Sequence, residues 1–173
     1  MTVVFYLSAA VAVISTALMI TRENAIHALL YMVLSLFSVA VIFFVLGAPF
    51  AAALEVIIYA GAIMVLFVFV IMMLAPGAHR TEESLGRPGL SAFVVPGVIA
   101  LVLVGEITWV VFSGSLGPAS GASVAPDQVG AALFGRYLSA VEMASLLLLA
   151  GLVGAYHLAR RDPAREDEGG ERS

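Results

Sequence analysis

The amino-acid sequence predicts an all-α membrane protein with five transmembrane helices. Of its 173 residues, 62% are apolar and only 12% are charged. Ordinary soluble domains have about a quarter of their residues charged. The mean hydropathy of +1.08 is also too high for a soluble domain of this length, which could not bury so much apolar surface. The composition therefore excludes a soluble enzyme, a disordered tail and a nucleic-acid-binding domain.

Five apolar runs are long enough to cross a bilayer, whose core takes about 20 helical residues. The first run follows only Met1 and Thr2 and so lacks the positive charge that begins a signal peptide, and we expect it to be retained as a helix. The predicted spans are residues 3–20, 26–46, 51–74, 91–112 and 138–158.

The connections between the spans predict how the helices are arranged. Residues 21–25 and 47–50 are so short that the first three helices should form an up-down-up set. Pro96 should kink the fourth helix. Gly151 and Gly154 give the fifth helix a face of small residues that suits helix packing.

Counting arginines on the two sides predicts the orientation. Arg136 is alone on the side of the N-terminus and of the loops 47–50 and 113–137. Positive charge accumulates on the cytoplasmic side of membrane proteins. We therefore expect the N-terminus outside and the C-terminus in the cytoplasm. The arginines on the cytoplasmic side are Arg22, Arg80, Arg87, Arg160, Arg161, Arg165 and Arg172.

The chain is interpreted as one five-helix domain, residues 1–159, followed by a charged cytoplasmic tail, residues 160–173. The tail has too few apolar residues to form a core. The loop 113–137 is rich in Gly, Ala, Ser and Pro, and we expect it to be mobile or ordered by a partner.

Three carboxylates, Glu55, Glu106 and Glu142, lie within the spans and in the outer half of the membrane. An acid at the centre of a helix costs about 3 kcal/mol on insertion, so such acids usually have a purpose. They either relay protons along a water path, or are shallow acids that reach headgroups or pair with another subunit. We favour the shallow interpretation for Glu106 and Glu142. No Lys or Arg lies in any span, so we expect their partners to be backbone, water, Tyr or another chain.

The third span, residues 51–74, is the most informative about function. Glu55 and Tyr59 are four residues apart and share a helical face. The small residues Ala60, Gly61 and Ala62 follow directly. They form either a packing notch for another helix or a hinge or π-bulge, which is common at functional sites. Composition alone favours the packing notch.

Other chemistry is not indicated. The sequence has no cysteine, which excludes disulfides, iron–sulfur ligation and thiol nucleophiles. His27, His79 and His157 are dispersed, so we expect no metal site. No Gly-rich nucleotide loop is present, so we expect no cofactor bound by this chain.

Two stretches, residues 24–47 and the run E-x-x-x-Y-A-G-A-I-x-V-L-F-x-F that begins at Glu55, closely resemble subunit J of bacterial NADH–quinone oxidoreductase, respiratory complex I. Its mitochondrial counterpart is NADH dehydrogenase subunit six. The resemblance is strong over residues 20–75, whereas the later helices agree in number, length and orientation.

The resemblance implies a multi-pass subunit of the bacterial cytoplasmic (inner) membrane. Family members lie in the membrane arm, near the quinone-site subunit and beside small proton-path subunits. The assembled translocase uses NADH, FMN, iron–sulfur clusters and a quinone, none of the redox centres being in this subunit. Helix 3 of the family can carry a π-bulge whose switching opens a water path. Carried over, this implies that Glu55, Tyr59, Gly61 and Val65 carry or gate protons, with Val65 as the apolar gate. Glu106 and Glu142 receive no role from it.

Alternatives remain at this point. A related module occurs in multisubunit cation/proton antiporters, which have no redox partner, and in membrane-bound hydrogenases. A purely structural assembly subunit is a third possibility.

Overall fold

The computed structural model describes residues 2–74, 90–112 and 123–160, in which every regular element is a helix. Five helices in this part of the chain are long and apolar enough to cross a membrane, which confirms the predicted spans. Their direction across the membrane stays a prediction from the arginines. The helices are α1 (Thr2–Ile20), α2 (Ala25–Val45), α3 (Pro49–Leu54), the π-helix η1 (Glu55–Ile63), α4 (Met64–Leu74), α5 (Leu90–Phe112), α6 (Pro126–Phe134) and α7 (Leu138–Ala159).

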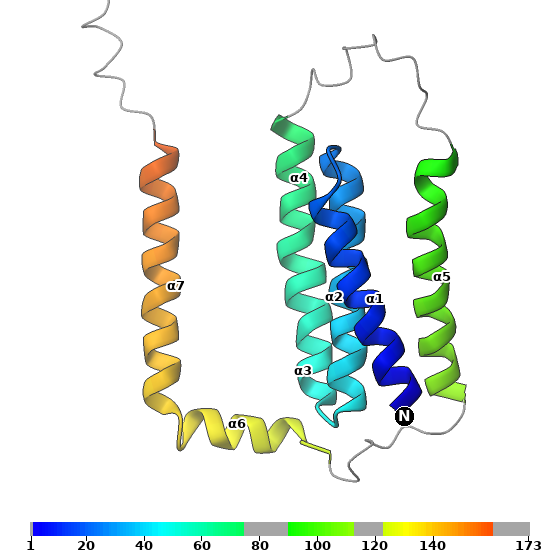
Figure 1. Ribbon diagram of the computed structural model, residues 1–173. Coiled ribbons are helices and arrows are strands. Elements are labelled where there is room, and N and C mark those ends of the chain that lie inside the picture. The colour runs from blue at the N-terminus through cyan, green and yellow to red at the C-terminus, as the bar shows by residue number, and fades with distance from the viewer. Residues whose placement is uncertain (1, 75–89, 113–122, 161–173) are drawn as a thin grey trace, which may run out of the picture. The chain divides into compact units, whose positions relative to one another are not determined.

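The chain divides into two compact units, Met1–Ala125 and Pro126–Ser173. In the first unit, α2 is the central helix and contacts α1, α3, η1, α4 and α5 (Figure 1). Hydroxyl groups join α1 to α2: Thr16 Oγ1 and Ser35 Oγ lie 2.8 Å apart, and Ser35 Oγ donates to the carbonyl of Ala12 at 3.2 Å. Such contacts replace the hydrophobic driving force that helices lack inside a bilayer.

Local sequence sets both ends of α2. The side chain of Asn24 accepts a hydrogen bond from the amide of Ile26 at 2.9 Å and caps the first turn. Gly47 follows the helix with a φ of 89°, which residues with a Cβ rarely adopt. Pro49 then begins α3, where its missing N–H is no loss. The carbonyl of Gly47 also accepts a hydrogen bond from the amide of Val124 at 2.9 Å.

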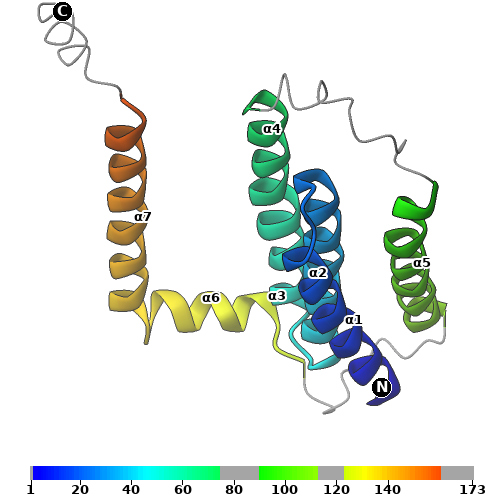
Figure 2. The ribbon, with the colours of Figure 1, turned by 45° about the horizontal axis from the view of Figure 1, so that its top comes forward.

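The third span is a single continuous rod of three segments, α3, η1 and α4, as both ribbon views show (Figures 1 and 2). Met64 is the first residue after η1, and its side chain is only 1% exposed. Most of α4 beyond it is exposed. The buried side chain of Met64 therefore packs the C-terminal end of the π-helical segment against the other helices of the first unit.

Replacement of Met64 by alanine is expected to destabilise the third span. Truncating a buried Met in a protein core costs about 2–5 kcal/mol. We expect a lower thermal-denaturation midpoint of the purified protein assembly and a lower yield. Met72 on the same rod is 68% exposed and offers a matched control, Met72→Ala, which should behave as wild type. Equal effects of both substitutions would contradict a packing role for Met64.

The second unit contains one element that the sequence analysis did not anticipate. Residues 126–134 form the helix α6, where we expected only a loop. Pro126 and Asp127 stand in its first turn, where proline and acidic residues favour helix initiation. The chain then turns through residues 135–137 into α7, and the amide of Tyr137 donates to the carbonyl of Ala132 at 2.9 Å. Residues 113–122 of the loop and 161–173 of the tail lie outside the described residues.

Candidate functional site

The third span changes its hydrogen-bond pattern where Glu55 begins η1. The amide of Glu55 still donates to Ala51 and Ala52, three to four residues earlier. Nine residues later, the amide of Met64 donates to the carbonyl of Tyr59, five residues earlier. This five-residue spacing defines a π-helix, which usually occurs as single-turn bulges at functional sites. Here the π geometry extends over nine residues, Glu55–Ile63.

Gly61 suits the π geometry because a side chain there would be crowded. A Cβ built on Gly61 would lie 3.2 Å from the carbonyl oxygen of Val56, five residues earlier. The close atom belongs to the backbone, so it cannot rotate away as the end of a flexible side chain could. The absence of a Cβ at Gly61 leaves room for the backbone of the widened helix, whereas the packing notch that composition favours stays a prediction.

The four residues singled out on this span lie on or near the surface of the first unit. Glu55 is half-buried, Tyr59 is 52% exposed and Val65 is 63% exposed, and Gly61 is exposed as well. Only Val56 and Ala60 of η1 share the half-buried state of Glu55. A water path along Tyr59 and Val65 would therefore need a second wall from outside the first unit.

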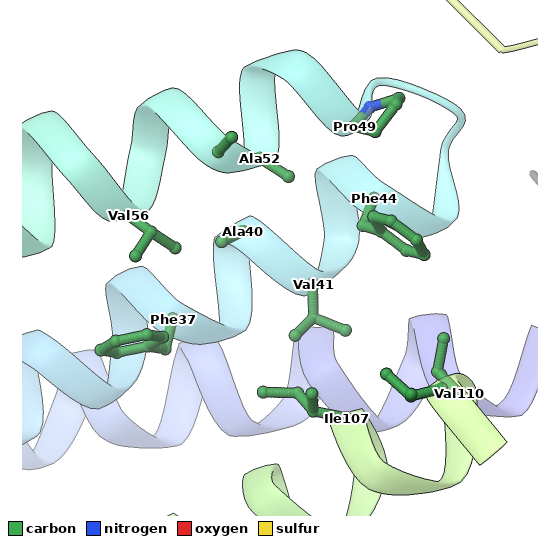
Figure 3. A pocket seen from close by; sticks show the side chains of 11 residues that line it. Phe37, Ala40, Val41, Phe44, Pro49, Ala52, Val56, Ile107 and Val110 are labelled. Atoms are coloured by element: carbon green, nitrogen blue, oxygen red, sulfur yellow. The ribbon is translucent and has the colours of Figure 1, made fainter. Parts of the chain in front are cut away.

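An apolar pocket of about 390 Å³ adjoins η1 within the first unit. Figure 3 shows Val56 of η1 facing it together with Phe37 and Phe44 of α2 and Ile107 of α5. Its lining has almost no polar atoms, so it suits a hydrocarbon chain or an apolar side chain rather than a polar cofactor. The pocket leaves an unfilled volume next to Val56, on the side of the π-helix that faces α2 and α5.

Glu106 departs from the sequence-based expectation. We expected a shallow acid whose partner would be backbone, water, Tyr or another chain. Instead, Glu106 is only 6% exposed, and its Oε1 accepts a hydrogen bond of 2.7 Å from the hydroxyl of Ser8 on α1. The expected set of partners was wrong, because it left out a serine from another span and a sequence does not tell which spans become neighbours. The depth of Glu106 in the membrane stays a prediction. The available signal was the spacing of Ser8 and Ser15, which places two small hydroxyls on one face of the first span.

The remaining candidates lie elsewhere. Glu142 is in the first two turns of α7, in the second unit, and is exposed there. The ring of His27 lies 5.1 Å from that of Phe93, and His157 stands in the last turn of α7. His79 lies outside the described residues. Among the residues that the structure describes, no group of three His, Cys, Asp or Glu side chains could hold a metal ion.

Comparison with known proteins gives a consistent result over most of the chain. The model of the family NADH-ubiquinone/plastoquinone oxidoreductase chain 6 matches residues 15–158. NADH-quinone oxidoreductase subunit J of Pseudomonas aeruginosa is 50% identical over 161 residues, which cover 91% of this chain and 96% of the relative. Subunit J of Escherichia coli K12 is 42% identical over 162 residues, or 94% of this chain and 88% of the relative. Subunit J of Rhodobacter capsulatus is 36% identical over 91% of this chain and 80% of its own length.

These matches extend well beyond residues 20–75, where the sequence motifs are strongest. They include the fourth and fifth spans and therefore α5 and α7. The family model thus begins within α1 and covers α2, the third span, α5 and nearly all of α7.

Proposed function

Because this chain belongs to the family of NADH-ubiquinone/plastoquinone oxidoreductase chain 6, we propose that it is a membrane-arm subunit that couples quinone reduction to proton translocation. The chain supplies no redox centre in this proposal. NADH, FMN, iron–sulfur clusters and quinone belong to other subunits of the complex. The single observation that carries the coupling role is the π-helical segment η1 in the third span.

Coupling would work through a change of η1 between π-helical and α-helical geometry. A π-bulge adds one residue to a turn, so its loss rotates the residues beyond it by about 100° relative to those before it. Tyr59 and Val65 lie on either side of the π-to-α boundary at Met64. The rotation would therefore change which of these two side chains lines a water path.

Three features of the first unit favour such a change. Gly61 lacks the side chain that would crowd the π form. The exposed surfaces of η1 and α4 impose few packing constraints from within the chain. The apolar pocket beside Val56 gives the segment space to move inward. Discrete rearrangements of this kind need two packings of similar free energy.

In this mechanism, Glu55 and Tyr59 act as proton-carrying or hydrogen-bonding groups at the start and middle of η1, and Val65 acts as the apolar gate. Neighbouring membrane-arm subunits, among them small proton-path subunits and the quinone-site subunit, would complete the path. We place the assembly in the bacterial cytoplasmic membrane, with the N-terminus of this chain outside.

Purification of the native assembly tests the proposal. The chain is tagged at its C-terminus, membranes are extracted in a mild detergent, and the co-purifying chains and NADH-to-quinone electron transfer are measured. We expect flavin and iron–sulfur subunits together with quinone-linked NADH oxidation. A redox-inactive assembly of membrane subunits would overturn the proposal and indicate a cation/proton antiporter. A redox-active assembly with another electron donor would indicate a membrane-bound hydrogenase or a similar relative.

A further inference from the structure

Glu106 is the one charged side chain that is buried among the residues placed by the structure. Its Oε1 accepts a hydrogen bond of 2.7 Å from Ser8 Oγ, and Ser8 is completely buried. The bond links α5 to α1, which are far apart in the sequence. An intramembrane acid that is held by a specific donor on another helix is a positioned group and a candidate for function.

The second oxygen of this carboxyl group has no hydrogen-bond partner. Oε2 of Glu106 is inaccessible in the structure, yet no described residue donates to it. No Lys or Arg occurs in the spans 3–20, 26–46, 51–74 and 91–112, so these spans supply no cation. A buried carboxyl oxygen left in this state is unfavourable unless it binds water or a proton.

A second unpartnered oxygen lies on the same side of α1. Ser8, Val11 and Ser15 are the buried residues of this helix, and their spacing puts them on one face. Ser15 is completely buried, and its hydroxyl has no partner among the described residues. Buried waters typically satisfy such groups by making about three hydrogen bonds each. Ser15 lies seven residues from Ser8, about 10 Å along the axis of α1, so this face carries a second unpartnered polar group two turns away from the Ser8–Glu106 pair.

On the helices α1, α2 and α5, no other titratable group competes for this position. Besides Glu106, helices α1, α2 and α5 carry only Tyr6, His27 and Tyr31 as titratable side chains. Tyr6 is 68% exposed. The ring of His27 contacts Phe93, which precedes Glu106 by about 20 Å along the axis of α5. Tyr31 lies near the same end of α2 as His27, with the guanidinium of Arg22 5.3 Å from its ring.

We propose that Ser8 and Glu106 form an internal proton-binding site that is linked to water. Glu106 carries a proton in the resting complex, Ser8 holds one carboxyl oxygen, and a water molecule binds the other. Uptake transfers one proton from a hydronium ion to Oε2, which leaves a water molecule and a neutral carboxyl group, and release is the reverse. The site is separate from η1 and does not depend on the proposed gate.

Infrared spectroscopy of the assembled complex in H₂O and D₂O tests the site. We expect the wild-type complex to show a carboxylic-acid C=O band that shifts on exchange into D₂O. The band is lost in Glu106→Gln, which keeps the size and the hydrogen-bond acceptor but has no acidic proton. In Ser8→Ala the band moves, because the hydrogen bond to Oε1 is missing.

A buried serine elsewhere provides the matched control. Ser38 is completely buried, and its hydroxyl donates to the carbonyl of Leu34 at 2.9 Å, so Ser38→Ala should leave the band unchanged. Identical carboxylic-acid bands in the wild-type and Glu106→Gln complexes would overturn the proton site. A Glu106-dependent band that does not shift on exchange into D₂O would overturn the link to water. If Glu106→Gln does not assemble, an unchanged spectrum of Ser8→Ala overturns the proposal. These readouts do not depend on pumping, so they stand apart from a test of η1.

Discussion

Replacement of Gly61 by valine is expected to lower the number of protons pumped per NADH oxidised about tenfold in an otherwise assembled complex. In the π-helical form, the new Cβ would lie 3.2 Å from the carbonyl oxygen of Val56, and the branched side chain adds further crowding. If this crowding destabilises the π-helical form by about 1.4 kcal/mol relative to the α-helical form, its population falls about tenfold. The substitution therefore favours the α-helical form and removes one of the two states that coupling requires.

Alanine at the same position should have a smaller effect in the same direction. It adds the crowded Cβ without branching, and alanine also favours a regular α-helix over glycine by about 1 kcal/mol. Gly97 on α5 provides the matched control, because a Cβ there would meet nothing within 4 Å. We expect Gly97→Ala to pump normally. Proteoliposomes with a pH-sensitive dye measure the ratio, and a wild-type ratio in assembled Gly61→Val would contradict the account.

Replacement of Glu55 by glutamine is expected to reduce NADH-driven proton pumping per assembled complex about tenfold or more. Glutamine matches glutamate in size and still makes hydrogen bonds, but it does not carry a proton. Hydrogen bonds to charged groups contribute about 1.5–3 kcal/mol, which corresponds to at least a tenfold change in rate when one is needed in the transition state. Tyr59→Phe, which removes only a hydroxyl on the exposed side of η1, should cause a several-fold reduction.

The measurement separates a role in coupling from a role in assembly. The amount of assembled complex is determined on native gels, and pumping is divided by that amount. Glu23 lies exposed between α1 and α2, outside both helices, so Glu23→Gln should change neither quantity. If Glu55→Gln lowers assembly and activity in equal proportion, Glu55 has only a structural role in assembly, and the proposed role in coupling is wrong.

The membrane helices could be predicted from the sequence because a bilayer leaves few options. A continuous apolar run of about 20 residues satisfies its backbone only as a helix. The observed ends of α2, Ala25 and Val45, differ by one residue from the predicted span, since Asn24 and Gly47 mark them locally. Helix α6 was missed because its nine residues are too few and too weakly apolar to register as a span.

The candidate site was predictable only in part. The motif at Glu55, Tyr59 and Gly61 identified the segment. The length of η1 depends on whether each amide bonds to the carbonyl four or five residues earlier, and the residue composition of the segment does not decide between these two patterns. The partnership of Ser8 and Glu106 was not predictable, because it depends on α1 and α5 becoming neighbours. Pairing between spans is a property of packing, which periodicity within one span does not reveal.

The proposed mechanism requires η1 to change between π-helical and α-helical geometry as the complex works. High-resolution cryo-electron microscopy of the assembled complex, oxidised and during turnover with NADH and quinone, tests it directly. We expect one population in which the amide of Met64 donates to the carbonyl of Tyr59, as here, and another in which it donates to Ala60 and Val65 is rotated by about 100°. The same π-helical pattern in every population, with unchanged side-chain directions at Tyr59 and Val65, would contradict the proposed switching of η1.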